Sequence, residues 1–181
     1  MTGLRSTRRA LLPLGAGLLL SGCGFRPIYA AHGDGTMGPA EAGLAATAVA
    51  IIPERSGQLL RQALQARLHR DGAVVARRYD LNVTMTLAGD PIGIQPDNSA
   101  SRVRLMGVAN WSLTARNAQR STLTAGTAKA IDGYNVLDQQ FFAADMESEV
   151  VIRRIAEALA DQTALQLAVY FNRQHAKGEK S

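Results

Sequence analysis

The chain has 181 residues, a formal net charge of +5, three histidines and a single cysteine. One cysteine excludes a disulfide within the chain, and the length suits a single domain that buries its own core. Residues 1–22 hold three arginines and no acid, so their removal lowers the net charge from +5 to +2. Such a charge does not predict a nucleic-acid-binding protein, which needs a concentrated basic face.

The first 22 residues have the composition of a bacterial export signal. Arg5, Arg8 and Arg9 precede an apolar run, Leu11–Leu20, which small residues follow. The run has ten residues and contains proline and glycine, whereas a transmembrane helix needs about 20 apolar residues. Because the arginine pair also occurs in twin-arginine signals, the export route, Sec or Tat, stays open. The destination is the periplasm of a Gram-negative cell.

The segment Leu20-Ser21-Gly22-Cys23 resembles a lipobox, the leucine–small–small–cysteine pattern at which lipoprotein signals are cleaved. The resemblance implies cleavage before Cys23, which then carries a diacylglycerol thioether and an N-acyl lipid. No other cofactor is expected. Acyl chains bury methylene groups at about 0.8 kcal/mol each, so a multiply acylated terminus stays on its membrane.

In the segment 24–46, the stretch Ala30–Ala46 is rich in glycine and alanine and shows neither a helical nor a strand period. This composition predicts a flexible tether. Within it, Phe25, Ile28 and Tyr29 are expected either at the level of the lipid headgroups or as a short strand on the domain. The predicted organisation is a signal peptide (1–22), a lipidated N-terminus and tether (23–46), one globular domain (47–173) and a polar tail (174–181).

The globular domain is predicted to begin with a buried strand at Thr47–Ile52, a short apolar run. An amphipathic helix follows, capped by Ser56 or Glu54 and ended by Asp71-Gly72. Its apolar side carries leucines four residues apart: Leu60, Leu64 and Leu68.

Three strands are predicted next from alternating apolar and polar residues, at Tyr79–Leu87, Arg102–Arg116 and Ser121–Ile131. A loop rich in glycine, proline and aspartate is expected at Ala88–Ser101. The last segment, Asp145–Phe171, contains no glycine or proline and predicts a long helix.

The predicted order of elements is therefore β-α-β-β-β-α. The strand–helix–strand unit predicts two parallel strands, and hairpins join the later ones. Two helices then cover one face of a four-stranded mixed sheet, which is an α/β (α+β) two-layer sandwich. The other face is expected to be polar and free for a partner: Asp80, Asn82, Thr84, Thr86, Ser112 and Thr114.

Catalytic or metal-binding groups do not converge in the sequence. The histidines fall in the tether, on a helix and in the tail, without the spacing of metal ligands: His32, His69 and His175. No nucleophile motif is found either. The sequence therefore predicts a protein that is not an enzyme and holds no metal.

The candidate binding residues are basic. Arg102 and Arg104 lie two residues apart on one side of a predicted strand, Arg116 lies on the same side at its far end, and Lys129 lies on the next strand. Guanidinium groups suit bidentate contacts with phosphate or carboxylate, so we predict that this set binds the head of an anionic glycolipid. The alternative is that these charges protect a strand edge from aggregation.

Two segments resemble a known family, the lipopolysaccharide-assembly lipoproteins. Leu20–Tyr29, which reads LSGCGFRPIY, is similar to the start of these proteins, and Ile155–Phe171 resembles their final helix. The resemblance implies two helices on a four-stranded sheet. It also implies an outer-membrane lipoprotein on the periplasmic side that plugs a large β-barrel partner, the lipopolysaccharide translocon, supports its assembly and helps lipopolysaccharide to reach the outer leaflet.

Gly24, in place of aspartate after the cysteine, fits sorting to the outer membrane. The family's basic residues do not align securely here, so the arginine prediction depends on their positions alone. An auxiliary or pilot lipoprotein of another outer-membrane transport or secretion system stays an alternative. An anchored cell-wall hydrolase is the enzyme alternative. It requires two facing carboxylates, and the candidates are Asp90, Asp97 and Asp132.

Overall fold

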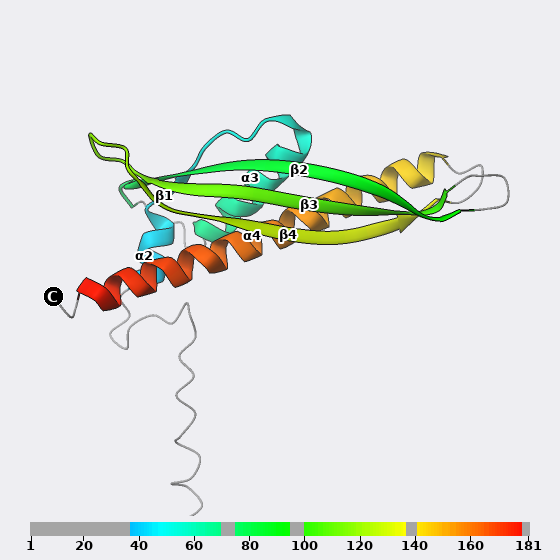
Figure 1. The fold of residues 1–181 in the computed structure, drawn as a ribbon. Helices are drawn as coiled ribbons and strands as arrows, with labels where there is room; N and C mark the ends of the chain where they lie inside the picture. Colours follow the sequence, from blue (N-terminus) through cyan, green and yellow to red (C-terminus); the bar gives the residue numbers. More distant parts are fainter. Residues whose placement is uncertain (1–36, 70–74, 95–99, 137–140, 179–181) are drawn as a thin grey trace, which may run out of the picture.

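The computed structural model describes residues 37–69, 75–94, 100–136 and 141–178. Helices and strands carry the labels of Figure 1. In chain order they are α2 (Pro39–Ala45), β1 (Thr47–Val49), α3 (Glu54–Leu68), β2 (Tyr79–Ile94), β3 (Ala100–Ala115), β4 (Thr122–Asn135) and α4 (Phe141–Gly178). The predicted order from the first strand to the last helix is confirmed, and α2 precedes it.

The strands form one four-stranded sheet in the order β1-β2-β3-β4. β1 runs parallel to β2 and pairs with it only from Thr47 opposite Tyr79 to Val49 opposite Leu81. The other neighbours, β2 with β3 and β3 with β4, are antiparallel. α3 is the crossover between the two parallel strands. The predicted mixed sheet is therefore confirmed.

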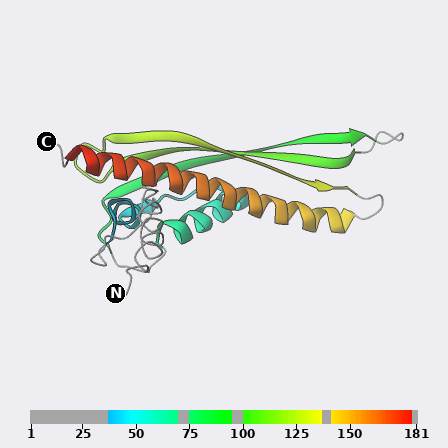
Figure 2. The ribbon, with the colours of Figure 1, turned by 90° about the horizontal axis from the view of Figure 1, so that it is seen from below.

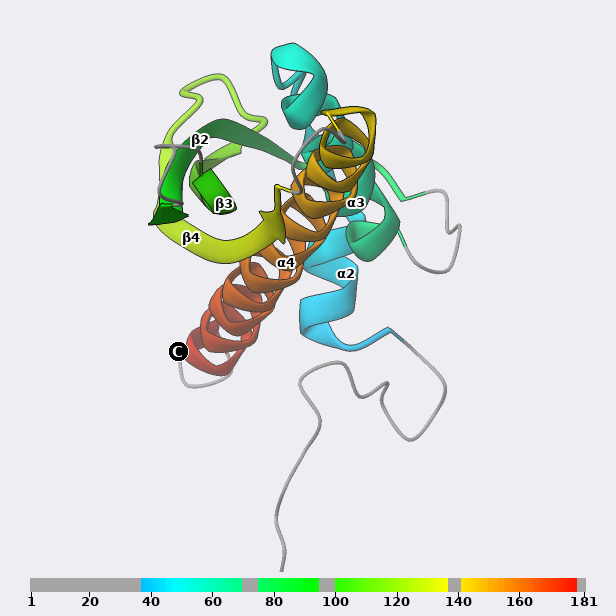
Figure 3. The same cartoon turned by 90° about the vertical axis from the view of Figure 1, so that its right-hand side faces the viewer.

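α3 and α4 cover one face of this sheet (Figure 2), and α2 lies on the same side (Figure 3). Two ion pairs join α3 to α4, Arg55 with Glu149 and Arg67 with Asp161, and both link residues 94 positions apart. The constant separation means that the two helices run in the same direction. The hydrogen bond from Arg55 lowers the pKa of Glu149.

Alternating side chains along β2 and β3 form the sheet half of the core. Leu81, Val83, Trp111 and Leu113 are buried against the helices. The helix half is a stripe of α4 side chains spaced by multiples of four residues: Val151, Ile155, Leu159, Leu167 and Phe171. Trp111 also donates its indole N–H to Gln166 Oε1 of α4 at 2.9 Å.

α2 corrects part of the predicted tether. Pro39–Ala45 is a helix, with the proline in its first turn, where a missing N–H costs nothing. Ala40 and Leu44 are buried, and Gly43 lies so close to the Phe171 ring that a Cβ there would overlap it. Small residues therefore allow α2 to pack tightly on α4. Residues 24–36 of the predicted tether lie outside the described residues.

The predicted loop at Ala88–Ser101 is also largely wrong, because β2 continues to Ile94 and β3 begins at Ala100. Pro91 is tolerated within β2 for a geometric reason. The Ala50 N–H bonds the Leu81 carbonyl from the β1 side, so odd-numbered residues of β2 direct their backbone groups away from β3. The absent N–H of Pro91 therefore costs no bond to β3.

Several ends differ from the prediction. β1 stops at Val49, three residues early. α3 begins at Glu54 after Pro53, and no side chain caps it. α4 is longer than predicted at both ends, and the expected polar tail is helical as far as Gly178. None of the helices in the described part of the chain is long and apolar enough to cross a membrane.

Gly107 sets the approach of α4 to β3. A Cβ at this position would overlap the Cγ2 methyl of Ile155 and lie 3.2 Å from Leu159 Cδ1. We predict that Gly107→Ala forces the two layers apart and costs about 1–3 kcal/mol, which lowers Tm by roughly 3–9 °C. The control is Gly89→Ala, whose Cβ would lie 3.1 Å from the end of the Leu105 side chain and in ordinary contact with Val103 Cγ1, at 3.8 Å. Equal melting temperatures for the two variants would contradict the prediction.

Candidate functional site

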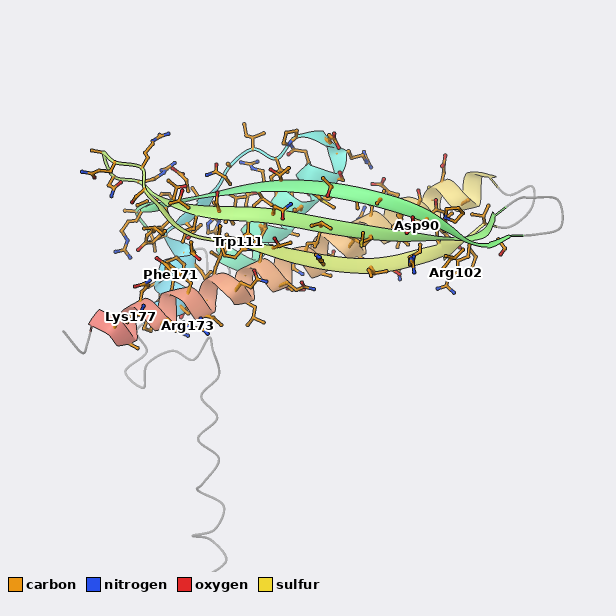
Figure 4. All side chains as sticks on the ribbon, in the orientation of Figure 1. Asp90, Arg102, Trp111, Phe171, Arg173 and Lys177 are labelled. Carbon is orange, nitrogen blue, oxygen red and sulfur yellow. The ribbon has the colours of Figure 1, made fainter. Side chains whose placement is uncertain are left out.

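The predicted basic residues lie on the open, outer face of the sheet, opposite the helices. The register places Arg102 opposite Asn135 and Arg104 opposite Asp90. Figure 4 shows Asp90 and Arg102 at one end of the sheet and Phe171 near the other. Since both arginines occupy even positions of β3, they lie on one face in neighbouring rows, about 7 Å apart.

Arg104 forms an ion pair with its cross-strand neighbour Asp90. Arg104 Nη2 lies 3.3 Å from Asp90 Oδ2, and the two side chains are 49% and 57% exposed. An ion pair this exposed contributes at most about 1 kcal/mol. Arg104 is therefore able to exchange its partner for another anion.

Arg102 is exposed, and it pairs with no acid among the described residues. Gly133 of β4 lies opposite Arg104, and a Cβ on that glycine would lie 3.6 Å from Arg102 Nε. The missing side chain leaves the guanidinium of Arg102 room beside β4. Its five N–H donors are thus available to an incoming anion.

The next row of the outer face is apolar. Met106 lies opposite Ala88 on one side and Ile131 on the other. Met106 is 36% exposed and Ile131 is 64% exposed. These three residues form an exposed apolar row that the sequence analysis did not single out. The sequence did contain a sign of the position of Met106, since this residue occupies an even position of β3, as Arg102 and Arg104 do.

Lys129 lies one row further on, opposite Val108. Its backbone bonds Gln162 of α4 through N–H and carbonyl, at 3.2 and 2.9 Å. Its side chain is exposed. The outer face therefore presents two arginines, an apolar row and a lysine in succession. We call this succession the outer-face site: Arg102, Arg104, Ala88, Met106, Ile131 and Lys129.

Arg116 does not belong to the outer-face site. Its Nε lies 2.8 Å from Asp80 Oδ1, next to the end of β3 that faces α2. Fourteen residues of extended strand separate it from Arg102, which is about 47 Å. Arg116 therefore lies too far from Arg102 and Arg104 to contact the same ligand head, and a binding role for Arg116 stays a prediction. Cys23, the predicted lipid attachment residue, lies outside the described residues.

The aspartates proposed for a hydrolase do not pair across a cleft. Asp90 contacts Arg104 on the outer face, whereas Asp132 lies opposite Leu105 and contacts Arg154 of α4 at 3.4 Å, on the helix side of the sheet. Asp97 is outside the described residues. Of the described histidines, His69 has its Nε2 3.0 Å from the Thr47 carbonyl oxygen. The described chain contains no cluster of three or more histidine, cysteine or acidic residues suited to a metal ion.

The family model for LptE, lipopolysaccharide-assembly, matches residues 44–167 of the chain. This range contains every residue of the outer-face site and all four described strands of the sheet. A search of curated proteins found no match.

Solved structures of bacterial lipoproteins are similar to this chain. A putative lipoprotein from Caulobacter crescentus is 24% identical, with a TM-score of 0.60 over 75% of this chain and 98% of that one. A minor lipoprotein from Acinetobacter baumannii is 14% identical, with a TM-score of 0.50 over 70% and 92% of the two chains. Rare lipoprotein B from Shewanella oneidensis is 12% identical over 74% and 98%, with a TM-score of 0.49.

The first two of these structures share the fold of this chain. The family match extends over more than half of its length and includes both α3 and most of α4. The chain thus belongs to the LptE lipopolysaccharide-assembly family, whose members are non-enzymatic lipoproteins.

Proposed function

We propose that this lipoprotein is anchored in the outer membrane through Cys23, on the periplasmic side, and binds lipopolysaccharide at the outer-face site. Arg102 and Arg104 contact the anionic head, and the apolar row of Met106 and Ile131 contacts the first part of the acyl chains. The observation that carries the proposal is the order of exposed cations and exposed apolar side chains along one face.

The chemistry of this site fits an anionic amphiphile better than a soluble anion. A guanidinium group binds phosphate or carboxylate in a bidentate manner, and the methionine–isoleucine row provides apolar surface about 7 Å away. A soluble phosphate would use the arginines and gain nothing from Ile131. If lipid A in this organism lacks phosphates, carboxylated sugars take their place in the same contacts.

We further propose that the domain fills a large outer-membrane β-barrel, helps it to assemble and assists delivery of lipopolysaccharide to the outer leaflet. The outer face, which offers hydroxyl and amide groups such as Thr84, Asn110 and Thr127, suits the polar lumen of a barrel. The described chain enters the domain at α2, at one end of the long sheet. This placement suits a plug that a lipid on Cys23 holds from the periplasmic side.

The open edge of β2 also supports enclosure by a partner. β1 covers β2 only as far as Leu81, and among the described residues no strand pairs with the outer side of β2 beyond it. The backbone groups of Val83, Met85 and Leu87 point toward this edge. An exposed edge of this kind can pair with strands of other molecules and so lead to aggregation. A surrounding barrel would prevent such pairing.

The first functional prediction concerns the arginines. Arg102→Gln combined with Arg104→Gln should weaken lipopolysaccharide binding at least tenfold, because each charge-assisted hydrogen bond is worth about 1.5–3 kcal/mol. Binding is measured by titration with dispersed lipopolysaccharide in detergent, and Tm should not change. The matched control is Arg55→Gln with Arg153→Gln, which removes the same charge from exposed helix positions. If both double variants bind as the parent does, the arginine contacts are wrong.

The second prediction separates acyl chains from the head. Ile131→Asn should weaken binding of intact lipopolysaccharide severalfold, while binding of its deacylated form, which offers no apolar part, should not weaken. The side chain is already 64% exposed, so folding should tolerate the change. Leu165→Asn, at a 45% exposed position of α4, is the control. A parallel loss for both ligands would contradict the assignment of the apolar row.

The third prediction concerns the partner and the anchor. Affinity capture of the tagged protein from detergent-solubilised outer membranes should recover a large β-barrel of the lipopolysaccharide-transport type. Intact mass spectrometry of the same preparation should show a chain that begins at Cys23 and carries acyl groups. Recovery of the components of a different transport or secretion system would instead favour the auxiliary or pilot role.

A further inference from the structure

The end of the domain remote from Arg102 has a different charge from the rest. Here α2, the starts of β1 and β2 and the last turns of α4 meet, and the Tyr79 and Phe171 rings lie 5.1 Å apart. Figure 4 shows Arg173 and Lys177 at this end, on α4. The first described residue, Met37, leads directly into α2, so the chain enters the domain here. We call this region the α2 end.

The α2 end carries a clear excess of positive charge. Its described cations, all exposed, are Arg77, Arg78, Arg116, Arg120, Arg173 and Lys177. Its described acids are Glu41 in α2 and Asp80 in β2. Six cations against two acids leave a formal excess of four positive charges. At the Arg102 end, by contrast, ion pairs balance the charges of Arg55, Arg104 and Arg154.

Local structure explains only part of this excess. Arg77 donates to the carbonyl of Ala45 at the end of α2, and Arg116 bonds Asp80. The carboxyl ends of helices contribute about half a negative charge each, so α2, α3 and α4 together offset fewer than two of the four charges. Arg120, Arg173 and Lys177 form no ion pair with a described acid.

Arg78 and Arg116 belong to one rigid corner of this surface. The Arg116 N–H bonds the Arg78 carbonyl at 2.9 Å, and the Arg78 guanidinium lies 5.7 Å from the centre of the Tyr79 ring. Tyr79 in turn packs on Phe171 of α4. The strand ends and the last turns of α4 are therefore held together, so that cations from both lie at the same end of the domain.

We propose that the α2 end docks on an anionic phospholipid surface and holds the domain against the membrane that carries its anchor. The placement rests on the proposed lipid at Cys23. Met37 follows Cys23 by 14 residues, a length that spans at most about 50 Å. Because β3 alone has 16 residues, or about 53 Å, the α2 end can reach the anchoring membrane with a relaxed link, whereas the Arg102 end would need a nearly fully extended one.

A short link also makes weak electrostatic binding sufficient. Tethering turns docking into an intramolecular step at high effective concentration. The attraction between cations and an anionic surface decays over a Debye length of about 8 Å at physiological ionic strength, so it acts only when the cationic surface approaches the headgroups. Anchor and cations thus act in sequence, the lipid by confining the domain and the cations by orienting it.

The test uses residues 24–181, which retain the whole described core from Ala40 to Phe171 and lack the lipid. Binding is measured by sedimentation with vesicles of phosphatidylcholine alone and of phosphatidylcholine with phosphatidylglycerol. We expect binding only to the second kind, and its loss when salt is raised. Arg173→Gln with Lys177→Gln should weaken it at least tenfold, since each cation near an anionic surface is worth about fivefold.

The control is again Arg55→Gln with Arg153→Gln, which lowers the net charge equally at other positions, and it should change vesicle binding by less than threefold. Circular dichroism and Tm establish that all variants are folded. Equal binding to both kinds of vesicle, or an equal loss in both double variants, would overturn the proposal. So would an absence of binding to the anionic vesicles, which would leave the surface to an acidic protein.

The outcome is independent of the proposed function. The vesicles contain no lipopolysaccharide and no barrel, so vesicle binding can succeed when lipopolysaccharide titration or barrel capture fails. If intact mass shows no lipid on Cys23 while the charge-specific vesicle binding persists, the anchor is wrong and the docking surface stands. If the lipidated protein captures its barrel but shows no preference for anionic vesicles, the proposed function stands and the docking surface is wrong.

Discussion

The close packing of α4 on the sheet is the interaction on which the other features depend. The stripe from Val151 to Phe171 lies against β3 and β4, and Gly107 removes the side chain that would hold the layers apart. Gln162 and Gln166 of the same helix bond backbone groups of Lys129 and Thr127 on the outer edge of β4. α4 therefore covers, together with α3, the inner face of the sheet and also protects part of the β4 edge.

Because α4 occupies the inner face and the β4 edge, the surfaces left for partners are the outer face and the β2 edge. The outer face carries the arginines and the apolar row, and these face away from every described helix. The β2 edge is open beyond Leu81. The two edges thus receive unequal protection, which is unusual for a domain exposed on all sides and is consistent with a domain enclosed on one side by another protein.

The sequence predicted the sheet well because its signals were local and periodic. Alternation along Tyr79–Leu87 and along β3 reflects one buried and one exposed face, and the spacing of apolar residues in α4 reflects one buried stripe. α2 was missed because alanines and glycine have no apolar period of their own, and its stability comes from contact with Phe171. The β2 extension was missed because Gly89, Pro91 and Gly93 are typical of loops, yet an open edge tolerates them.

For the candidate site, the sequence proposed Arg102 and Arg104 but could not set the distances between the candidate residues. Whether Arg116 or Ile131 lies near Arg102 depends on register and on strand length, and both follow from pairing between distant segments. Met106 and Ile131 interrupt an otherwise polar face. In the sequence, an apolar residue at an exposed position looks like an exception to the alternating pattern. Only the cross-strand register shows that Met106 and Ile131 lie side by side in one row.

In the two proposals, the α2 end meets the membrane and the outer-face site meets lipopolysaccharide. Of the two arginines in the outer-face site, Arg104 is paired with Asp90, which an incoming anion must displace, whereas Arg102 pairs with no described acid. Cations at the α2 end meet few acids and act by total charge, which suits a surface of many single charges. The α2 end differs from the outer-face site in its formal excess of positive charge, six described cations against two described acids, and such an excess suits an electrostatic docking surface.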